Sequence, residues 1–143
     1  MVEKLYEASM AGVQIRLLIR GNCSLVTGEA FSENIRIHAI IDRFLEHSRI
    51  LFFCNGGDER CFVGSTDWMS RNLNKRVEVM APVYDKEVRD ELRWIVEYGL
   101  KDTTQGRVVD GLGANKFYTS PTTPAFRSQE ELYNHYKNTL DTR

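Results

Sequence analysis

The chain has 143 residues, of which 42% are hydrophobic and 27% are charged, so it can bury the core of one ordinary globular domain but not of two. Lysine and arginine together number 19 and aspartate and glutamate 20, and the net charge of -1 gives no global attraction for nucleic acid or for an acidic membrane. Any anion-binding site must therefore come from local clustering of basic residues.

The predicted elements begin with a helix, because Val2, Leu5, Tyr6 and Met10 share one helical face and Gly12 suits the residue after a helix end. The alternating segment VQIRLLIRG then predicts a strand that ends at Arg20-Gly21. Ser32 can cap a second helix whose apolar residues recur with helical spacing: Ile37, Ile40, Ile41, Phe44 and Leu45. This predicted helix carries His47 at its C-terminal end.

Two short apolar runs, RILFFC and RCFVGS, are separated by NGGDE and predict a β-hairpin. The segment RVEVMAPV predicts a further strand with Val77 and Val79 on one face, closed by Pro82. Asp85 can cap the next helix, which is expected to end at Gly99.

The C-terminal part contains two weaker extended segments, RVVDGLG and NKFYTS, and a Pro/Thr-rich connector at residues 119–127. Ser128 and Glu131 then form the pattern of a capping box at the start of a last helix. The order of elements predicts the α/β class, as a single domain of residues 1–143 in which helices cover a mixed sheet.

The three cysteines, Cys23, Cys54 and Cys61, lack the spacing of metal ligands, and we interpret them as reduced thiols. No apolar run is long enough to span a bilayer, and the N-terminal segment is acidic and amphipathic rather than a signal peptide. These features predict a cytoplasmic protein, with peripheral association with a membrane left open.

Arginine outnumbers lysine in the part of the chain before Pro82. Guanidinium groups match phosphate oxygens bidentately, so this bias favours recognition of oxyanions. Arg20 is the first candidate, because it lies where a strand gives way to a glycine loop, the place where α/β sheets present ligand-binding groups. An ion pair with Glu29, Glu33 or another nearby carboxylate is the alternative interpretation.

His47 is the second candidate. Arg49 follows two residues later, so an extended backbone places both side chains on one side, and Gly64-Ser65 at the end of the hairpin can approach them. Imidazole, guanidinium and hydroxyl groups beside backbone N–H groups could handle phosphate. Alternatively, His47 interacts only with the last carbonyls of its helix. His38 and His135 are interpreted as structural or surface residues, and the sequence identifies no metal site.

The spacing His47-x-Arg49, followed by Gly64-Ser65-Thr66-Asp67, resembles one half of a phospholipase D-like domain, whose signature is His-x-Lys-x4-Asp and then Gly-Ser-x-Asn. Arg49 replaces the lysine, Cys54 the aspartate and Asp67 the asparagine. These departures argue against a plain phosphodiesterase. Asp67 either orients His47 or caps the turn that starts at Trp68.

A longer resemblance runs from Leu5 to Tyr118, through IRGNCSL, FSENIRIHAIIDRFLEHSRI, NGGDE, STDWMSRNL and RVEVMAPV. These segments look like the C-terminal, phospholipase D-like domain of polyphosphate kinase. The resemblance implies reversible transfer of the terminal phosphoryl group of ATP to polyphosphate, with Mg²⁺, through a phosphohistidine in a preceding domain that this chain lacks. It implies that Arg20 binds ATP phosphates and that His47 is the second active-site histidine, with Arg49 and Ser65 as further phosphate contacts.

The partners that this resemblance implies are ATP, polyphosphate and the remaining domains of the same enzyme, in a homo-oligomer and without nucleic acid. Two alternatives remain. The chain could be a phospholipase D-like phosphodiesterase that completes its site from two identical halves across a two-fold axis. It could also be a non-catalytic module that binds polyphosphate through its arginines.

Overall fold

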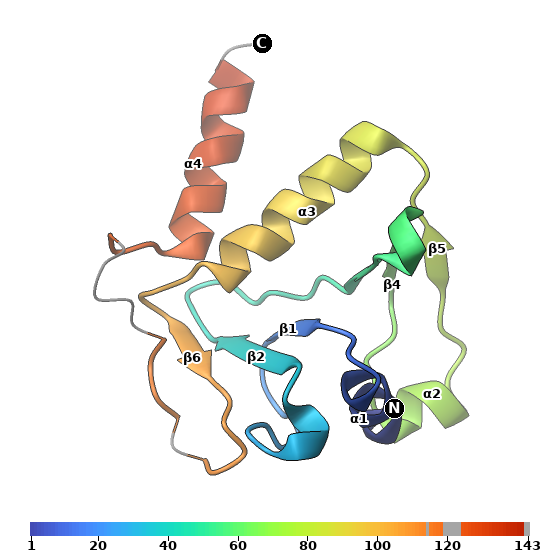
Figure 1. Cartoon of the computed structure of the whole chain (residues 1–143). Helices are drawn as coiled ribbons and strands as arrows, with labels where there is room; N and C mark the ends of the chain where they lie inside the picture. Colours follow the sequence, from blue (N-terminus) through green and yellow to red (C-terminus); the bar gives the residue numbers. More distant parts are fainter. Residues whose placement is uncertain (114, 119–123, 142–143) are drawn as a thin grey trace. The chain divides into compact units, whose positions relative to one another are not determined.

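The structure, a computed structural model, describes residues 1–113, 115–118 and 124–141. Its α-helices are α1 (Val2–Met10), α2 (Ser70–Lys75), α3 (Lys86–Leu100) and α4 (Ser128–Asp141). Its strands are β1 (Ile15–Ile19), β2 (Ile35–Ile40), β3 (Ile50–Phe53), β4 (Arg60–Gly64), β5 (Met80–Pro82) and β6 (Gly106–Val108) (Figure 1). Short 3-10 helices lie at Ala30–Ser32 and Asn55–Gly57. The predicted α/β class is confirmed.

Contacts along the chain define two compact units, which are described separately below. Unit 1 consists of Met1–Leu45 and Glu97–Arg143, and unit 2 of Glu46–Val96. The strands form two three-stranded sheets, one in each unit, where the sequence had suggested one mixed sheet. That the whole chain acts as a single domain stays a prediction.

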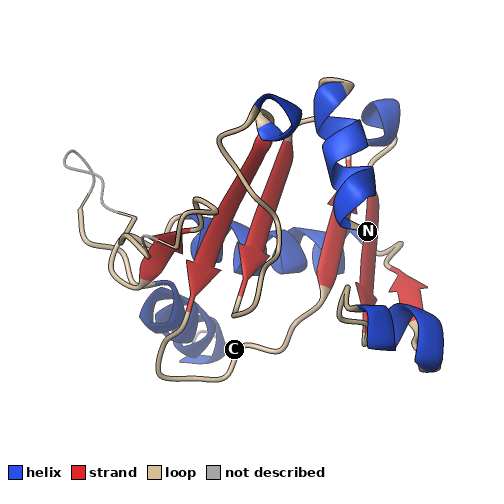
Figure 2. Ribbon diagram, turned by 90° about the horizontal axis from the view of Figure 1, so that it is seen from below, coloured by secondary structure: helices blue, strands red, loops and turns tan. Residues whose placement is uncertain are grey.

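The sheet of unit 1 has the order β1-β2-β6 and is mixed: β1 and β2 run parallel, whereas β6 is antiparallel to β2 (Figure 2). One face is apolar, because Ile35 and Ile37 of β2 are buried with Leu25 in the main core. Leu5 and Tyr6 of α1 pack against this cluster, as predicted from the helical face that they share. Gly12, with φ of 88°, ends the helix in the left-handed region that favours glycine.

The helix predicted after Ser32 is wrong, because these residues form strand β2. The start of this segment also fits the alternation of buried and exposed side chains along a strand, because Ile35 and Ile37 are buried while Arg36 between them is exposed. Isoleucine is β-branched and favours an extended backbone, and pairing with β1 on one side and β6 on the other stabilises it. Ile41, Phe44 and Leu45 are exposed in the irregular segment that follows, so they make no helical stripe.

The other face of this sheet packs against the end of α3 and the segment that follows it. A Cβ atom on Gly99, near the end of α3, would lie 2.3 Å from Leu18 Cδ2, so a larger residue there would require the Leu18 side chain to move. His38 is buried on β2, with Nε2 3.1 Å from the carbonyl oxygen of Asp102. Because a carbonyl only accepts, Nε2 carries the proton and donates. The structural interpretation of His38 is consistent with this contact, although the residue lies on a strand rather than on a helix.

Asp102 is fully buried and links two segments of the chain, the turn at residues 104–106 and the start of α4. Its Oδ1 accepts the backbone N–H groups of Thr104, Gln105 and Gly106 at 2.9, 2.7 and 3.1 Å. Its Oδ2 accepts both the backbone N–H and the hydroxyl of Ser128, each at 2.7 Å. The capping box predicted for Ser128 is therefore replaced by a carboxylate from another segment, which caps the first residue of α4.

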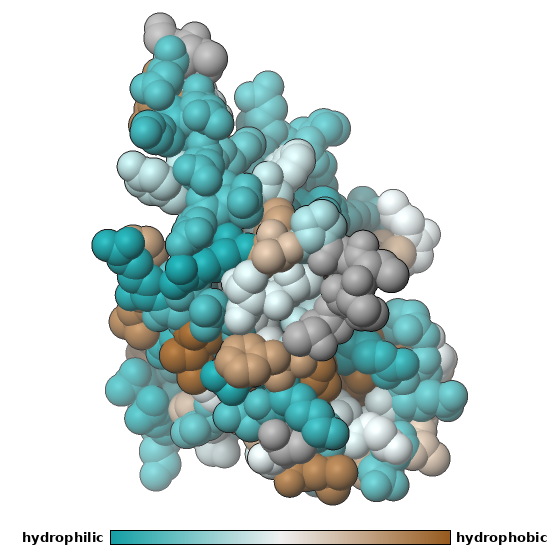
Figure 3. Space-filling view, turned by 90° about the vertical axis from the view of Figure 1, so that its left-hand side faces the viewer, coloured by the Kyte–Doolittle hydropathy of each residue, from teal (hydrophilic) through white to brown (hydrophobic). Residues whose placement is uncertain are grey.

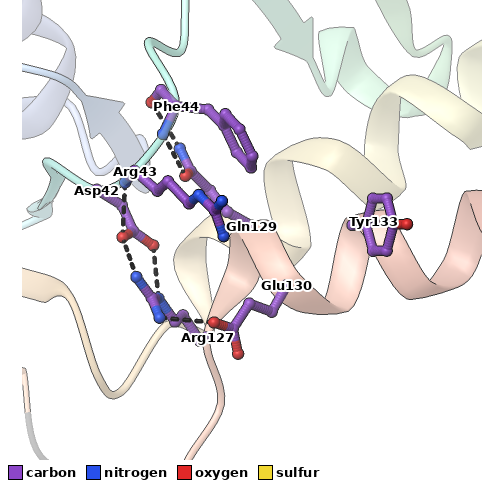
Figure 4. A pocket seen from close by; sticks show the side chains of 7 residues that line it. All are labelled: Asp42, Arg43, Phe44, Arg127, Gln129, Glu130 and Tyr133. Atoms are coloured by element: carbon purple, nitrogen blue, oxygen red, sulfur yellow. Dashed lines mark hydrogen bonds and ion pairs between the residues drawn. The ribbon is translucent and has the colours of Figure 1, made fainter.

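A second set of polar contacts fastens the segment after β2 to the start of α4 (Figure 4). Arg127 donates from Nε and Nη2 to the two carboxylate oxygens of Asp42, at 3.0 and 2.6 Å. Gln129 exchanges two 2.8 Å hydrogen bonds with the backbone of Phe44. We call these four residues the Asp42 clasp. Beyond the clasp, α4 presents mainly hydrophilic residues on the face seen in Figure 3.

Unit 2 contains an antiparallel sheet of order β3-β4-β5. The β3-β4 hairpin is confirmed, with Ile50 opposite Val63 and Phe53 opposite Arg60. The next predicted strand begins later than expected, at Met80, because Val77 and Val79 are exposed and only Met80–Pro82 pairs with β4. Asp85 caps α3 as predicted, since its carboxylate accepts the N–H of Val88 at 3.0 Å.

None of the described helices is long and apolar enough to cross a membrane. The Pro/Thr-rich connector predicted at residues 119–127 lies partly outside the described residues, because positions 119–123 are not among them.

Candidate functional site

His47 and Arg49 lie together in unit 2, in the extended segment that leads into β3. His47 is exposed and is not at a helix end, so the interpretation as a helix-capping histidine is wrong. Arg49 Nη1 lies 2.5 Å from His47 Nδ1 and donates to the His47 carbonyl oxygen at 2.6 Å, while Nη2 lies 3.1 Å from Nε2. The two side chains are on one side of the backbone, as the alternation of an extended chain requires.

Asp67 holds Arg49 from the other side. Arg49 donates to Asp67 Oδ1 from Nε at 3.1 Å and from Nη2 at 2.7 Å, and only 17% of the arginine side chain is exposed. These hydrogen bonds from Arg49 lower the pKa of the Asp67 carboxyl below its usual range. Asp67 therefore neither caps the turn at Trp68 nor contacts the imidazole directly. It orients Arg49, and Arg49 in turn contacts the imidazole.

This chain of contacts has a chemical consequence for His47. The guanidinium of Arg49 has N–H donors and no acceptor, so only the ring nitrogen of His47 that carries no proton can accept a hydrogen bond from it. The exposed ring remains accessible to a ligand, while the charge of Arg49 is balanced by Asp67. The arrangement therefore presents an exposed imidazole beside a fixed cation, which suits contact with phosphate oxygens.

The backbone of the hairpin brings Gly64 next to Arg49, since Gly64 N–H donates to the Arg49 carbonyl oxygen at 3.0 Å. A side chain is excluded at Gly64, where a Cβ atom would lie 2.4 Å from the Val79 carbonyl oxygen. The approach of Gly64-Ser65 to the segment of His47, expected from the hairpin, is thus present at the level of the backbone.

The Ser65 hydroxyl is engaged elsewhere. It donates to a carboxylate oxygen of Glu78 and accepts the N–H of Val79 at 3.2 Å. Asn72 donates to the other Glu78 oxygen at 2.7 Å, and the hydrogen bond from Ser65, followed by that from Asn72, lowers the pKa of Glu78. A phosphate contact by Ser65, which stays a prediction, would have to replace the bond to Glu78 and would be opposed by that negative charge.

Arg20 lies in unit 1, directly after the last residue of β1. It lines a hollow at the carboxyl ends of the parallel strands β1 and β2, together with the segment Gly21–Val26 and residues that follow β6. This is the edge at which α/β sheets bind ligands, and it was the reason for choosing Arg20 from the sequence.

No metal site is formed by the described residues: no three of their histidine, cysteine, aspartate and glutamate side chains gather as metal ligands would. The hairpin carboxylates Asp58 and Glu59 are paired with Arg60 and Arg93.

Comparison with known proteins connects these features to one family. Residues 1–129 match the family model described as "Polyphosphate kinase C-terminal domain 2". This chain belongs to the polyphosphate kinase family. The polyphosphate kinase of Vibrio vulnificus is 45% identical over 139 residues, and that of Escherichia coli K12 is 37% identical over the same length. The crystal structure of polyphosphate kinase from Porphyromonas gingivalis superposes with a TM-score of 0.94 at 39% identity.

These similarities cover almost all of this chain but a small part of each relative. The alignments span 96% of this chain and 20% of the Vibrio and Escherichia polyphosphate kinases. The structural superposition covers 99% of this chain and 22% of the Porphyromonas polyphosphate kinase. The chain thus corresponds to about one fifth of the length of those enzymes.

Some residues of interest were not selected from the sequence. Glu78 accepts a hydrogen bond from Ser65, and Asp102 accepts one from Ser128. No sequence pattern marks either carboxylate, because each contact joins segments that are distant in sequence. Arg107 also lines the hollow of Arg20. The glycine-rich segment that follows Arg107, DGLG, was the available signal.

Proposed function

We propose that this chain is the C-terminal catalytic domain of an ATP:polyphosphate phosphotransferase. In this reaction the bond between the terminal phosphorus of ATP and its bridging oxygen breaks, a phosphohistidine forms in a preceding domain, and ADP leaves. The phosphoryl group then passes from the histidine to the terminal oxygen of polyphosphate, and both steps are reversible. The observation that carries the proposal is family membership over residues 1–129.

His47 is assigned the role of a histidine that contacts the nucleotide phosphates and helps to move charge or a proton during transfer. Its contact with Arg49, which Asp67 orients, supports this assignment. Phosphoryl transfer depends mainly on positioning and on stabilising negative charge, and this side-chain arrangement is suited to both. Arg20, at the carboxyl edge of the unit 1 sheet, is assigned a contact with ATP phosphates.

The proposed substrates are ATP and polyphosphate, and the proposed partners are the remaining domains of the enzyme in a homo-oligomer. No step is assigned to a metal ion held by this domain; among its described residues, no three histidine, cysteine, aspartate or glutamate side chains gather as metal ligands would. We place the protein in the cytoplasm, where its three free cysteines would stay reduced.

The test is a substitution in the full-length enzyme that carries this domain. His47→Ala is expected to lower ATP-dependent polyphosphate synthesis by about 10²-fold or more, the usual contribution of an acid or base group. ATP formation from ADP and polyphosphate should fall equally, since the steps are reversible. His135→Ala, on the half-buried side of α4, is the matched control and should retain activity.

Unchanged synthesis in His47→Ala, with normal folding, would reject the role assigned to His47. Metal-independent cleavage of a nitrophenyl phosphodiester by the 143-residue chain would instead favour the phosphodiesterase alternative. If the full-length protein binds polyphosphate but catalyses neither polyphosphate synthesis nor ATP formation, the non-catalytic module is favoured.

A further inference from the structure

The tip of the β3-β4 hairpin carries an asparagine that is followed directly by glycine, Asn55-Gly56. Each of the other asparagines in the sequence precedes a residue that has a side chain. The backbone nitrogen of a residue can attack the side-chain amide of a preceding asparagine and close a succinimide ring. Glycine has no Cβ atom to shield that nitrogen. Asn55 is therefore the asparagine of this chain at which ring closure meets the least steric resistance.

The fold leaves this turn open to solvent. Asn55, Gly56 and Gly57 form the 3-10 turn between the two strands, and all of them are exposed. A Cβ atom placed on Gly56 or Gly57 would meet no atom within 4 Å apart from the adjacent residues. No described part of the chain therefore packs against this side of the turn, and both the ring and the water that opens it have space.

The backbone of the turn lies in a region that side chains disfavour. Asn55, Gly56 and Gly57 have φ of 47°, 65° and 100°. For a residue with a Cβ atom this conformation is less favourable than an extended or right-handed one, although asparagine tolerates it better than most. Ring closure requires Asn55 to rotate about its Cα–C bond and to leave this conformation. The free energy lost by that rotation is smaller than in a helix or a strand, where the native backbone is the preferred one.

Exposed hydrogen bonds among the described residues of the turn oppose this rotation. The N–H of Gly57 donates to the Cys54 carbonyl oxygen at 2.9 Å, and the N–H of Asp58 donates to the Asn55 carbonyl oxygen at 3.2 Å. Asn55 Nδ2 donates to the Asp58 carbonyl oxygen at 3.1 Å. Because water can replace each partner, the tip can open while the paired strands stay formed. We expect ring closure at Asn55 to be about tenfold slower than in an unfolded peptide.

We propose that Asn55 is a site of spontaneous covalent modification, at which asparagine converts to aspartate and isoaspartate. The Gly56 backbone nitrogen forms a bond to Asn55 Cγ, the bond from Cγ to Nδ2 breaks, and the proton of the Gly56 nitrogen leaves with Nδ2 as ammonia. Water then opens the succinimide. Attack at Cγ breaks the bond from Cγ to the ring nitrogen and gives aspartate. Attack at the backbone carbonyl carbon breaks its bond to that nitrogen and gives isoaspartate, in which the chain continues through Cγ. The only co-reactant is solvent water.

Both products place a carboxylate on a turn that is already acidic. Asp58 and Glu59 follow closely in sequence and are paired with Arg60 and Arg93. Isoaspartate also adds the Cβ atom to the path of the backbone, so the hydrogen bonds that close the present turn cannot form unchanged. The isoaspartate form should therefore melt at a lower temperature than the unmodified chain. The aspartate form should differ little, because aspartate also tolerates a positive φ.

The test is peptide mapping by mass spectrometry after the folded 143-residue chain has been incubated at mildly alkaline pH, where the attacking nitrogen loses its proton more readily. The peptide FFCNGGDER, incubated alongside, gives the rate for the unfolded sequence. Asn55 should gain the mass of the amide-to-acid change at about one tenth of the rate of the peptide. Synthetic standards identify the two products at this position as aspartate and isoaspartate.

Asn115 is the internal control, because it is also exposed and has a positive φ of 49° but precedes Lys116. It should convert more slowly than Asn55, since the lysine side chain shields the attacking nitrogen. Asn55→Gln should abolish the products at residue 55, because glutamine would have to close a larger and less favourable ring. Asn115→Gln, the matched variant, should leave conversion at Asn55 unchanged. Circular dichroism establishes that each variant is folded.

Two results would overturn the proposal. One is that Asn55 in the folded chain stays unmodified during an incubation that converts the reference peptide completely. The other is that Asn115 converts as fast as Asn55, which would show that the glycine turn confers no special reactivity. Both results are read from masses and not from turnover, so they are distinguishable from failure of the function proposed for His47.

Discussion

At the scale of single residues, the surroundings of His47 are set by two side chains, Arg49 and Asp67. Arg49 is near it in sequence, and the period of an extended chain was enough to predict that they would meet. The contact between Arg49 and Asp67 was not predictable in the same way, because it depends on the hairpin that brings residues 18 positions apart together. Asp67 is therefore a positioning residue for Arg49.

Substitution of Asp67 tests this arrangement. Asp67→Asn keeps an acceptor for Arg49 but removes the charge that balances it, so the full-length enzyme should lose about tenfold in kcat, the scale of one charge-assisted contact. Asp58→Asn, at the exposed hairpin tip beside Arg60, is the control and should leave kcat unchanged. An unaltered kcat in Asp67→Asn would contradict the positioning role.

His38 gives a second prediction at this scale. Burial lowers the pKa of His38 below the ordinary value of 6.5, although its hydrogen bond to the Asp102 carbonyl opposes the change. The unfolded chain then binds a proton that the folded chain excludes, so this group destabilises the fold as pH falls below about 6.5. The free energy of unfolding in urea should therefore be lower at pH 5 than at pH 7.5.

The comparison with variants isolates the effect of His38. His38→Gln should reduce this loss of stability, whereas His135→Gln should leave it in place. Equal pH dependence in the unsubstituted chain and in His38→Gln would show that other groups cause it.

At the scale of elements, sequence patterns identified α1, β1, the β3-β4 hairpin and the start of α3, each from local signals. The segment from Ser32 to His47 shows where local signals fail. Its isoleucines satisfy the spacing of a helix and that of a strand, and the choice is made by hydrogen bonds to β1 and β6, which are distant in sequence. The cap of α4 likewise comes from Asp102 and not from the adjacent capping-box residues.

The Asp42 clasp yields a prediction about elements. The Asp42 side chain is 3% exposed, so Arg127→Met leaves a buried carboxylate without its partner and should lower the free energy of unfolding by about 2 kcal/mol at pH 7. Hydrogen bonding by Arg127 lowers the pKa of Asp42, so the contribution is present above the unfolded pKa of about 3.9 and is lost as pH falls through the folded value. Chemical denaturation at several pH values measures both effects.

Arg16→Met is the control for the clasp, because Arg16 pairs with Glu97 while 59% of the Arg16 side chain is exposed. An exposed ion pair contributes about 0.5 kcal/mol or less. Equal losses in the two variants would mean that burial of Asp42 adds nothing.

At the scale of the whole molecule, the family could be recognised from the sequence because its segments extend along most of the chain. The positions of Arg20 and His47 in two different compact units could not, because the unit boundary depends on contacts between residues distant in sequence. The end of β1 at Arg20 was anticipated as a ligand site, whereas the parallel pairing with β2 and the position of Arg107 beside it required the sheet register.

The share of its relatives' length that this chain covers leads to a prediction of activity. The chain covers 20% of the length of the Vibrio vulnificus polyphosphate kinase, and the proposed phosphohistidine belongs to another domain. The 143-residue chain alone should therefore not synthesise polyphosphate from ATP. Adding the remaining domains in trans should restore synthesis, measured as incorporation of labelled phosphate. Sustained synthesis by the chain alone would place the phosphorylated residue within it.

Asp102 has a consequence for how this fold can diversify. One buried carboxylate fixes the backbone at Thr104–Gly106 and again at Ser128, so the intervening chain leaves and returns at the same point of the framework. That intervening chain includes Arg107 and the glycine turn of the hollow. Exchanges after β6, at residues 109–113, could alter ligand preference while the sheet and α4 keep their places, which makes this turn a natural target for redesigning specificity.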